Sequence, residues 1–291
     1  MSVISDVDVT PNRLSILYQF VQERGEMGIP AQDLRAYLGP NALQRTKNPE
    51  GPREPIAEAI MREAKRLHII QEEEGTLRVP KELRGKSSTD LQTFLDGTLL
   101  DLERAEATDQ RTFPRALAWF LCQDPAHPLS FGTNYNLLVN EDCGEEVSAY
   151  GLTNQARFQN FVYWAAYLGF AWRLEVADQA NFVMPDPTEA LARHLRPILE
   201  DKGRLPIAEA LALLAQSCPV LEGGAARREV EERLTPAKQR QPDALSKSTS
   251  LALERLEHQR LIHLHDADDA PVHLLTNRRD PRPVSHVSLA S

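Results

Sequence analysis

Cysteine is scarce in this sequence. The 291 residues include three cysteines, which lie far apart at Cys122, Cys143 and Cys218. An odd and sparse set does not make a disulfide framework, and no Cys-x-x-Cys pair is present to hold structural zinc. We therefore expect buried, chemically inert thiols.

Long hydrophobic runs are also lacking. No apolar run approaches the roughly 20 residues that a membrane-spanning helix needs. Residues 1–6 have neither the basic start nor the apolar core of a signal peptide. The sequence therefore predicts a cytoplasmic protein with no membrane partner. Its length and its 42% of hydrophobic residues suit two or three folded domains.

Catalytic motifs are missing as well. There is no Gly-x-Ser-x-Gly turn of the kind that carries a nucleophilic serine. Gly85-Lys86-Ser87 resembles the end of a phosphate-binding loop, but that loop needs a glycine where this chain has Pro80. Acidic residues come in runs typical of solvated helix faces, such as Glu229, Glu231 and Glu232. We predict a protein that is not an enzyme, with no catalytic residues and no cofactor.

The charge balance is acidic. Lysine and arginine number 33 against 42 aspartates and glutamates, which gives a net charge of −9. A protein that coats DNA is usually basic. The balance favours protein partners, or a narrow contact with nucleic acid through a local basic patch.

One short pattern occurs three times. In each copy an amphipathic helical stripe ends, one polar or small residue follows, and apolar residues then begin a strand that turns back on itself. The three junctions are Leu67-His68-Ile69-Ile70, Leu168-Gly169-Phe170 and Gln259-Arg260-Leu261-Ile262. This is how the last helix and the wing of a winged-helix domain look in sequence. The predicted fold is mainly α with small β-hairpin wings (α+β), built from tandem winged-helix domains.

The three copies divide the chain. We predict an N-terminal winged-helix domain at 1–80, a linker at 81–90, a middle domain at 91–187 and a C-terminal domain at 188–276. Residues 277–291 have no evident core pattern, so we expect a mobile tail there. In the last domain the wing is predicted as a hairpin within 260–276.

The N-terminal domain is the best candidate for contact with DNA. Its predicted helices span 11–24, 31–38 and a third stretch from about residue 55, followed by a hairpin at 68–79. Basic residues gather on the third helix and the loop before it: Arg45, Lys47, Arg53, Arg62, Lys65 and Arg66. A helix of this kind fits the major groove, where arginine grips guanine with two hydrogen bonds.

The same helix supports a second interpretation. Glu54, Glu58 and Glu63 share it, and the predicted wing tip carries Glu72, Glu73 and Glu74. A mixed-charge face of this composition also suits solvent or a docked protein.

The aromatic helix at 153–168 offers a candidate partner interface. Phe158, Phe161, Trp164 and Leu168 form one stripe at helical spacing, which predicts core. Tyr163 and Tyr167 lie on the flank of that stripe. They are predicted either to pack inside or to form an exposed interface with a protein partner.

Histidines collect near the last wing. His263 and His265 share a strand face, and whether His273 joins them depends on the hairpin register. A metal site needs three converging ligands. Surface imidazoles are the better interpretation, so no metal is predicted.

Residues 11–80 and 248–276 resemble bacterial winged-helix proteins, in helix spacing and in the apolar pair that opens each wing. The opening Val3-Ile4 with Pro11-Asn12-Arg13-Leu14, followed by winged helices, resembles the DpdG family. These are accessory proteins encoded with the bacterial 7-deazaguanine DNA modification and restriction cluster. The resemblance implies a DNA modification context and supplies no catalytic residues.

Three functions remain open from the sequence. The first is a non-catalytic subunit or adaptor of a bacterial DNA-associated complex, in phage defence or DNA modification, whose first domain contacts double-stranded DNA. The second is a sequence-specific transcription regulator. The third is a protein-only scaffold, similar to the acidic winged-helix partners of SMC–kleisin complexes. Other protein subunits are the expected partners in the first and third.

Overall fold

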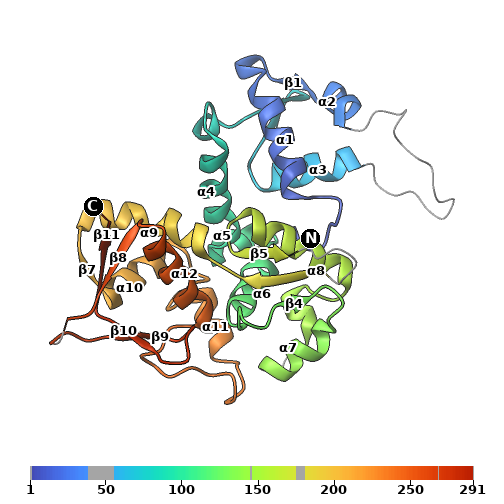
Figure 1. Ribbon diagram of the computed structural model, residues 1–291. Helices are drawn as coiled ribbons and strands as arrows, with labels where there is room; N and C mark the ends of the chain where they lie inside the picture. Colours follow the sequence, from blue (N-terminus) through green and yellow to red (C-terminus); the bar gives the residue numbers. More distant parts are fainter. Residues whose placement is uncertain (1, 39–55, 145, 175–180, 268, 291) are drawn as a thin grey trace.

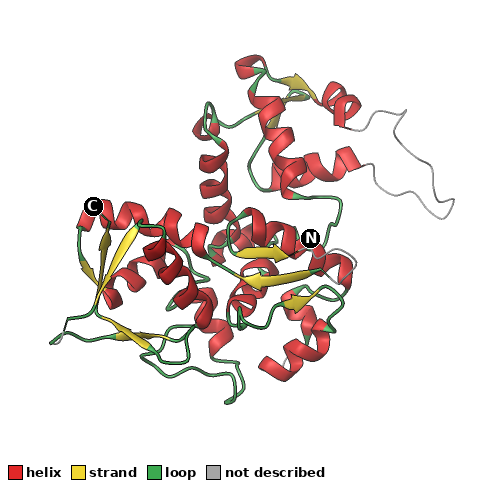
Figure 2. Ribbon diagram, in the orientation of Figure 1, coloured by secondary structure: helices red, strands yellow, loops and turns green. Residues whose placement is uncertain are grey.

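The computed structural model describes residues 2–38, 56–144, 146–174, 181–267 and 269–290. Helices dominate, and the strands form small antiparallel sheets (Figure 2). Three units follow one another along the chain, and each carries one three-stranded sheet. The fold is therefore mainly α with small sheets, as predicted. None of the helices in these ranges is long and apolar enough to cross a membrane.

The first unit begins with α1, which buries Leu14, Leu17, Tyr18 and Val21 and so confirms the predicted stripe. Its last strand, β3, lies in the middle of the sheet, in the order β1-β3-β2. The elements are α1 (Pro11–Gln22), a 3-10 turn (Gly25–Met27), β1 (Ile29–Pro30), α2 (Ala31–Leu38), α3 (Ile56–Arg66), β2 (Gln71–Glu73) and β3 (Thr76–Arg78).

The segment predicted as a linker is structured in part. It holds a 3-10 turn (Lys81–Leu83), in which Leu83 is buried, and the start of α4 (Ser88–Leu99). Ser87 caps α4: its hydroxyl accepts from the Asp90 N–H, and the Asp90 carboxylate accepts from the Ser87 N–H at 2.8 Å. In Figure 1, α4 leads from the first unit down to the rest of the molecule. A short helix, α5 (Leu102–Ala107), follows.

The middle unit repeats the topology of the first. Its sheet order is β4-β6-β5, again with the last strand in the centre. The elements are α6 (Thr112–Leu121), β4 (Leu129–Ser130), α7 (Tyr135–Cys143), a 3-10 turn (Val147–Tyr150), α8 (Gln155–Tyr167), β5 (Ala171–Leu174) and β6 (Phe182–Pro185).

The third unit has the same sheet order, β7-β11-β8, with two insertions. One is α11, and the other is a separate hairpin of β9 and β10. The elements are α9 (Thr188–Lys202), β7 (Leu205–Pro206), α10 (Ile207–Ser217), α11 (Ala225–Glu231), α12 (Lys247–His258), β8 (Ile262–His265), β9 (His273–Leu275), β10 (Arg282–Val284) and β11 (His286–Leu289).

Two predictions for the C-terminal region are wrong. The strand at 262–265 does not pair within residues 260–276, because β8 pairs with β11 instead. The expected mobile tail contains β10 and β11, and Val284 and Val287 are fully buried. These strands have three or four residues each and bury only alternate side chains, a signal too short to stand out beside several prolines.

The repeated junction seen in the sequence is a left-handed turn. His68, Gly169 and Arg260 each follow the third long helix of their unit with φ between 56° and 80°. The next residue then donates its N–H to the carbonyl five positions earlier, a pairing typical of a helix C-terminus. The three bonds are Ile69 to Ala64 (2.8 Å), Phe170 to Ala165 (2.8 Å) and Leu261 to Leu256 (3.0 Å).

Glycine is required at only one of these turns. A Cβ on Gly169 would lie 2.9 Å from the Glu189 Cβ and 3.0 Å from the Ala190 nitrogen. His68 and Arg260 are exposed and accept the left-handed conformation.

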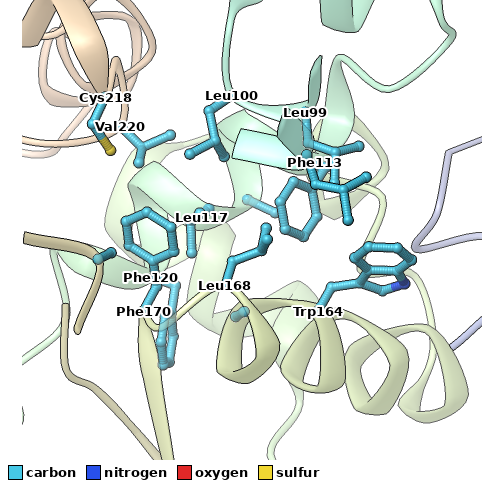
Figure 3. Packing of buried hydrophobic residues seen from close by; sticks show 14 of the residues in the cluster. Leu99, Leu100, Phe113, Leu117, Phe120, Trp164, Leu168, Phe170, Cys218 and Val220 are labelled. Carbon is cyan, nitrogen blue, oxygen red and sulfur yellow. The ribbon is translucent and has the colours of Figure 1, made fainter. Parts of the chain in front are cut away.

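One hydrophobic core runs through all three units. Figure 3 shows its centre, where Leu99 and Leu100 at the end of α4 meet the side chains of α6 and α8. Cys218 and Val220, which follow α10, close the same cluster from the third unit. The three units therefore pack against one another through this shared core.

Replacing Trp164 tests this packing. Trp164 is fully buried and its indole N–H donates to the Val9 carbonyl at 3.1 Å. We expect Trp164→Ala to lower the free energy of unfolding by about 3–5 kcal/mol in urea titrations. Trp172→Ala is the control, because Trp172 is 54% exposed and its loss should cost about 1 kcal/mol or less. Equal effects would contradict this account of the core.

A matched pair of substitutions tests the last strand. Val287 faces the core and is fully buried, whereas its neighbour Ser288 faces the other side of the sheet. Val287→Asp should lower the thermal midpoint strongly, because it buries an unpaired charge. Ser288→Asp should have a much smaller effect. A mobile tail would instead tolerate both substitutions equally.

Candidate nucleic-acid and partner surfaces

Residues 2–10, here called the N-terminal strap, fasten the first unit to the middle one. The Val3 N–H donates to the Gln110 side chain at 2.6 Å, and the Asn160 amide donates to the carbonyls of Val3 and Asp6. Val3, Ile4 and Val9 are fully buried. Because buried backbone groups must find partners, these side chains of the middle unit fix the path of the strap.

Helix α3 is docked onto the same network. Its Glu63 is buried and accepts a hydrogen bond from the Gln110 side chain at 2.5 Å. Arg66 lies 3.4 Å from the other carboxylate oxygen. Burial raises the pKa of Glu63, and the attraction of Arg66 and the hydrogen bond from Gln110 only partly offset that effect.

The described basic residues of α3 each lie beside a carboxylate. Arg62 lies 2.8 Å from Asp6 of the strap, and Lys65 lies 2.8 Å from Glu72 of the hairpin. Arg66 pairs with Glu63, as above. Arg62 and Arg66 thus lie at the contact between the first and middle units, whereas the side chain of Lys65 is 41% exposed. The other candidates, Arg45, Lys47 and Arg53, lie outside the described residues.

The third long helices of the three units are buried to a similar extent. In α12 every residue from Ser248 to Glu257 is buried or half-buried, and in α8 the same holds from Asn160 to Tyr167. In α3 it holds from residue 57 to residue 64, and Lys65 near the end of the helix is exposed. Lys65 is therefore the side chain of α3 that a charged partner could reach.

The two candidate interface tyrosines of α8, Tyr163 and Tyr167, have different surroundings in the structure. The four-residue stripe beside them, from Phe158 to Leu168, is fully buried and confirms the predicted core. Tyr163 is half-buried, with the Arg173 guanidinium 4.8 Å from its ring centre. Tyr167 accepts a hydrogen bond from Ser15 of α1 at 3.0 Å, so it contributes to the contact between the first and middle units. A role in binding another protein stays a prediction for both.

A buried ionic cluster joins the middle and third units. Arg227 on α11 is 1% exposed and donates to Glu231 at 2.8 Å and to the Ala118 carbonyl of α6 at 3.3 Å. Burial opposes ionisation of Glu222 nearby, but Arg227 and hydrogen bonds from Ser246 and Thr249 outweigh it and keep the Glu222 pKa below its usual value. The sequence predicts a solvated helix face for Glu231, but the structure pairs it with the buried Arg227. The spacing of four residues between Arg227 and Glu231 is the sequence feature that could have predicted this pair.

The histidines near the last strands do not converge on one point. His265 lies opposite His286 across β8 and β11, and His263 lies opposite Ser288. His273 belongs to the separate β9–β10 sheet. Within the part of the chain that the structure describes, no group of three or more His, Cys, Asp or Glu side chains is placed to hold a metal ion.

These features define an α+β protein made of three units with one topology, joined by a shared core and a buried strap. The family model described as DpdG-like matches residues 1–270, and the chain belongs to this family. No curated protein and no solved structure shows a significant match to the chain.

The buried carboxyl of α3 generates a pH prediction. Because the folded-state pKa of Glu63 lies above its ordinary value of about 4.5, ionisation costs stability as the pH rises through the folded-state pKa. Glu63→Gln removes that cost and keeps an oxygen to accept from Gln110. In urea titrations, the stability of the variant relative to wild type should be smallest near pH 4 and should grow toward neutrality.

The control for this experiment is Glu103→Gln. Glu103 is exposed on α5, so the difference between this variant and wild type should change little over the same pH range. An advantage of Glu63→Gln that shrinks as the pH rises would contradict the assignment.

Proposed function

We propose that this protein is a non-catalytic subunit or adaptor of a bacterial DNA-associated complex, in DNA modification and phage defence, built from three winged helices. The DpdG-like family suggests the DNA modification context. The observation that carries the proposal is the repeated order of helix, strand, two or more helices and two sheet strands, with the last strand always central in the sheet; in the third unit the β9–β10 hairpin is inserted between those two strands. That order is the one expected of a winged helix.

The basic residues of the first unit support a DNA contact there. In helix-turn-helix proteins the recognition helix presents side chains to the major groove. Lys65 is exposed near the end of α3, and Arg45, Lys47 and Arg53 precede that helix in the sequence. The first unit lies above the other two in Figure 1, and we propose that it carries the DNA contact through these four residues.

A second candidate is a protein-only scaffold. It is favoured by the carboxylate partner beside each described basic residue of α3, and by the net charge of −9. In this case the same faces bind other proteins, and the acidic residues of the hairpin repel phosphate.

Salt-dependent binding to duplex DNA separates the two candidates. We expect wild type to bind random duplex DNA at low salt, with an affinity that falls steeply between about 50 and 300 mM salt. Replacing Arg45, Lys47 and Arg53 together by alanine should weaken binding and flatten the salt dependence. Lys65→Ala should reduce the slope by about one. Fluorescence anisotropy with a labelled duplex measures both quantities.

Lys65 is chosen because Arg62 pairs with Asp6 of the strap and Arg66 pairs with the buried Glu63, so their loss would mix docking with DNA contact. Arg196→Ala is the control: Arg196 is exposed on α9 and pairs with Glu200, as Lys65 pairs with Glu72. It should bind like wild type. If wild type does not bind at the lowest salt, the DNA contact is excluded and the scaffold function stands.

A further inference from the structure

The outer face of the middle sheet is apolar and open to solvent. Trp172 of β5 lies opposite Met184 of β6, and two residues further on Leu174 lies opposite Phe182. Directly opposite residues share one face of an antiparallel sheet, and the fully buried Val183 marks the other face. Trp172 and Leu174 are 54% and 48% exposed, and their two partners are half-buried. Four neighbouring apolar side chains therefore form one exposed patch.

The corresponding faces of the other two sheets are polar. The buried Leu77 and Val287 mark the core faces of those sheets. The outer positions in the first unit are Gln71, Glu73, Thr76 and Arg78. The outer positions in the third unit are His263, His265, His286 and Ser288. One topology thus presents three different surfaces, and the apolar one has the character of a binding surface for another protein.

The strand that carries Trp172 is also an edge strand. In the order β4-β6-β5 it has a neighbouring strand on one side, among the described residues. The Asp186 N–H donates to the Phe170 carbonyl at 3.0 Å, which sets the alternation of hydrogen bonds along β5. Ala171 then needs no bond from its opposite residue, Pro185, which has no N–H. The N–H and C=O of Ala171 therefore point away from β6, toward the edge.

A hollow of about 290 Å³ lies beside this edge. It is lined by the consecutive residues 171–173, whose side chains alternate between the two faces, so the hollow follows the edge of the strand. Its other walls come from Arg255 and Gln259 of α12 and from the start of α9. The edge and the apolar patch meet at Trp172.

Glu189 supplies the charge that the hollow offers to a ligand. Of the other charged residues that line it, Arg255 pairs with Asp186. The Arg173 guanidinium lies 4.8 Å from the centre of the Tyr163 ring. Glu189 is exposed and has no ion pair or hydrogen bond from its side chain to another residue that the structure describes. A lysine or arginine of a ligand is its electrostatic complement.

The size of the patch fits a short segment better than a second folded subunit. The four apolar side chains expose on the order of 300 Å². A stable interface between folded proteins buries about 800 Å² on each partner. An extended segment adds main-chain hydrogen bonds along the edge to this small apolar area, which is how β-strand addition achieves affinity.

We propose that β5 binds an extended segment of a partner protein, which pairs with it as a fourth strand. Alternate side chains of the segment continue the apolar row of Trp172 and Leu174, and a lysine or arginine at one end reaches Glu189. This surface is the partner-binding site of the proposed adaptor, so the inference rests on that part of the proposed function. It is independent of the DNA contact of the first unit.

Selection from a phage-displayed library of random linear peptides tests the surface. The full chain is the bait, and the double variant Trp172→Ala with Leu174→Ser removes peptides that bind elsewhere. We expect enriched peptides with alternating apolar residues and a lysine or arginine near one end. No enrichment, or enrichment of peptides without this pattern, would overturn the inference. Binding of wild type to duplex DNA, measured separately, shows whether the proposed DNA contact stands in that case.

An enriched peptide labelled with fluorescein locates the site by anisotropy. The double variant should bind it about tenfold more weakly or worse, because an exposed tryptophan is a typical anchor. Glu189→Gln should weaken binding less and flatten its dependence on salt. Leu137→Ser is the matched control, since Leu137 is 56% exposed on α7, outside the patch. Melting curves confirm that the variants fold, and unchanged binding by the double variant would refute the assignment.

Methylation of the peptide backbone tests strand addition without altering the protein. Methyl groups on alternate nitrogens remove either the N–H donors that face β5 or those that face away from it. We expect one set to abolish binding and the other set to preserve it. Equal effects of the two sets would show that the peptide does not bind as a strand.

Discussion

Each unit of this protein depends on how the chain leaves its third long helix. The chain must reverse within one residue so that the following apolar side chains enter a strand beneath the helix. A left-handed residue at 68, 169 and 260 makes that reversal, and the next N–H closes the helix end. Without it, the strands could not reach the last strand of the unit, which forms the centre of every sheet. One local conformation, used three times, thus sets the architecture of the chain.

The units are bound together by different means at their two junctions. The first junction combines buried apolar residues of the strap with hydrogen bonds: Val3, Ile4 and Val9 join the core, and the buried backbone groups of the strap are matched by Gln110 and Asn160. The second combines a shared apolar core with the ionic cluster around Arg227. Removing one member of a buried ionic pair leaves an uncompensated charge, so the second junction is sensitive to single substitutions in this cluster.

Local signals in the sequence predict much of the fold. Helical periodicity identifies α1 and the aromatic helix α8, and the pattern of helix, turn and apolar pair marks all three left-handed turns. Long-range pairing leaves no comparable signal. The partner of β8 lies beyond an inserted hairpin, and β11 has too few residues to show a period, so the sequence predicts a mobile tail where two strands form. For the candidate DNA-binding residues, the sequence shows that they are basic but not which carboxylates lie beside them. Arg62, for example, pairs with Asp6, and residues so far apart in the sequence leave no spacing pattern that predicts their contact.

The central position of each last strand has a consequence for how the protein acquires its shape during synthesis. In the first and middle units the last strand pairs with the first strand across about 50 residues, with Ile29 opposite Leu77 and Leu129 opposite Val183. In the third unit β7 pairs with β11 across about 80 residues, as Leu205 lies opposite Val287. Closing so long a loop slows the pairing. The strap has a similar delay, since Val3 meets Asn160 across 157 positions. We therefore expect the β7 edge and the strap to pair last during folding, so that the unpaired edge is exposed to aggregation and to chaperones in that interval.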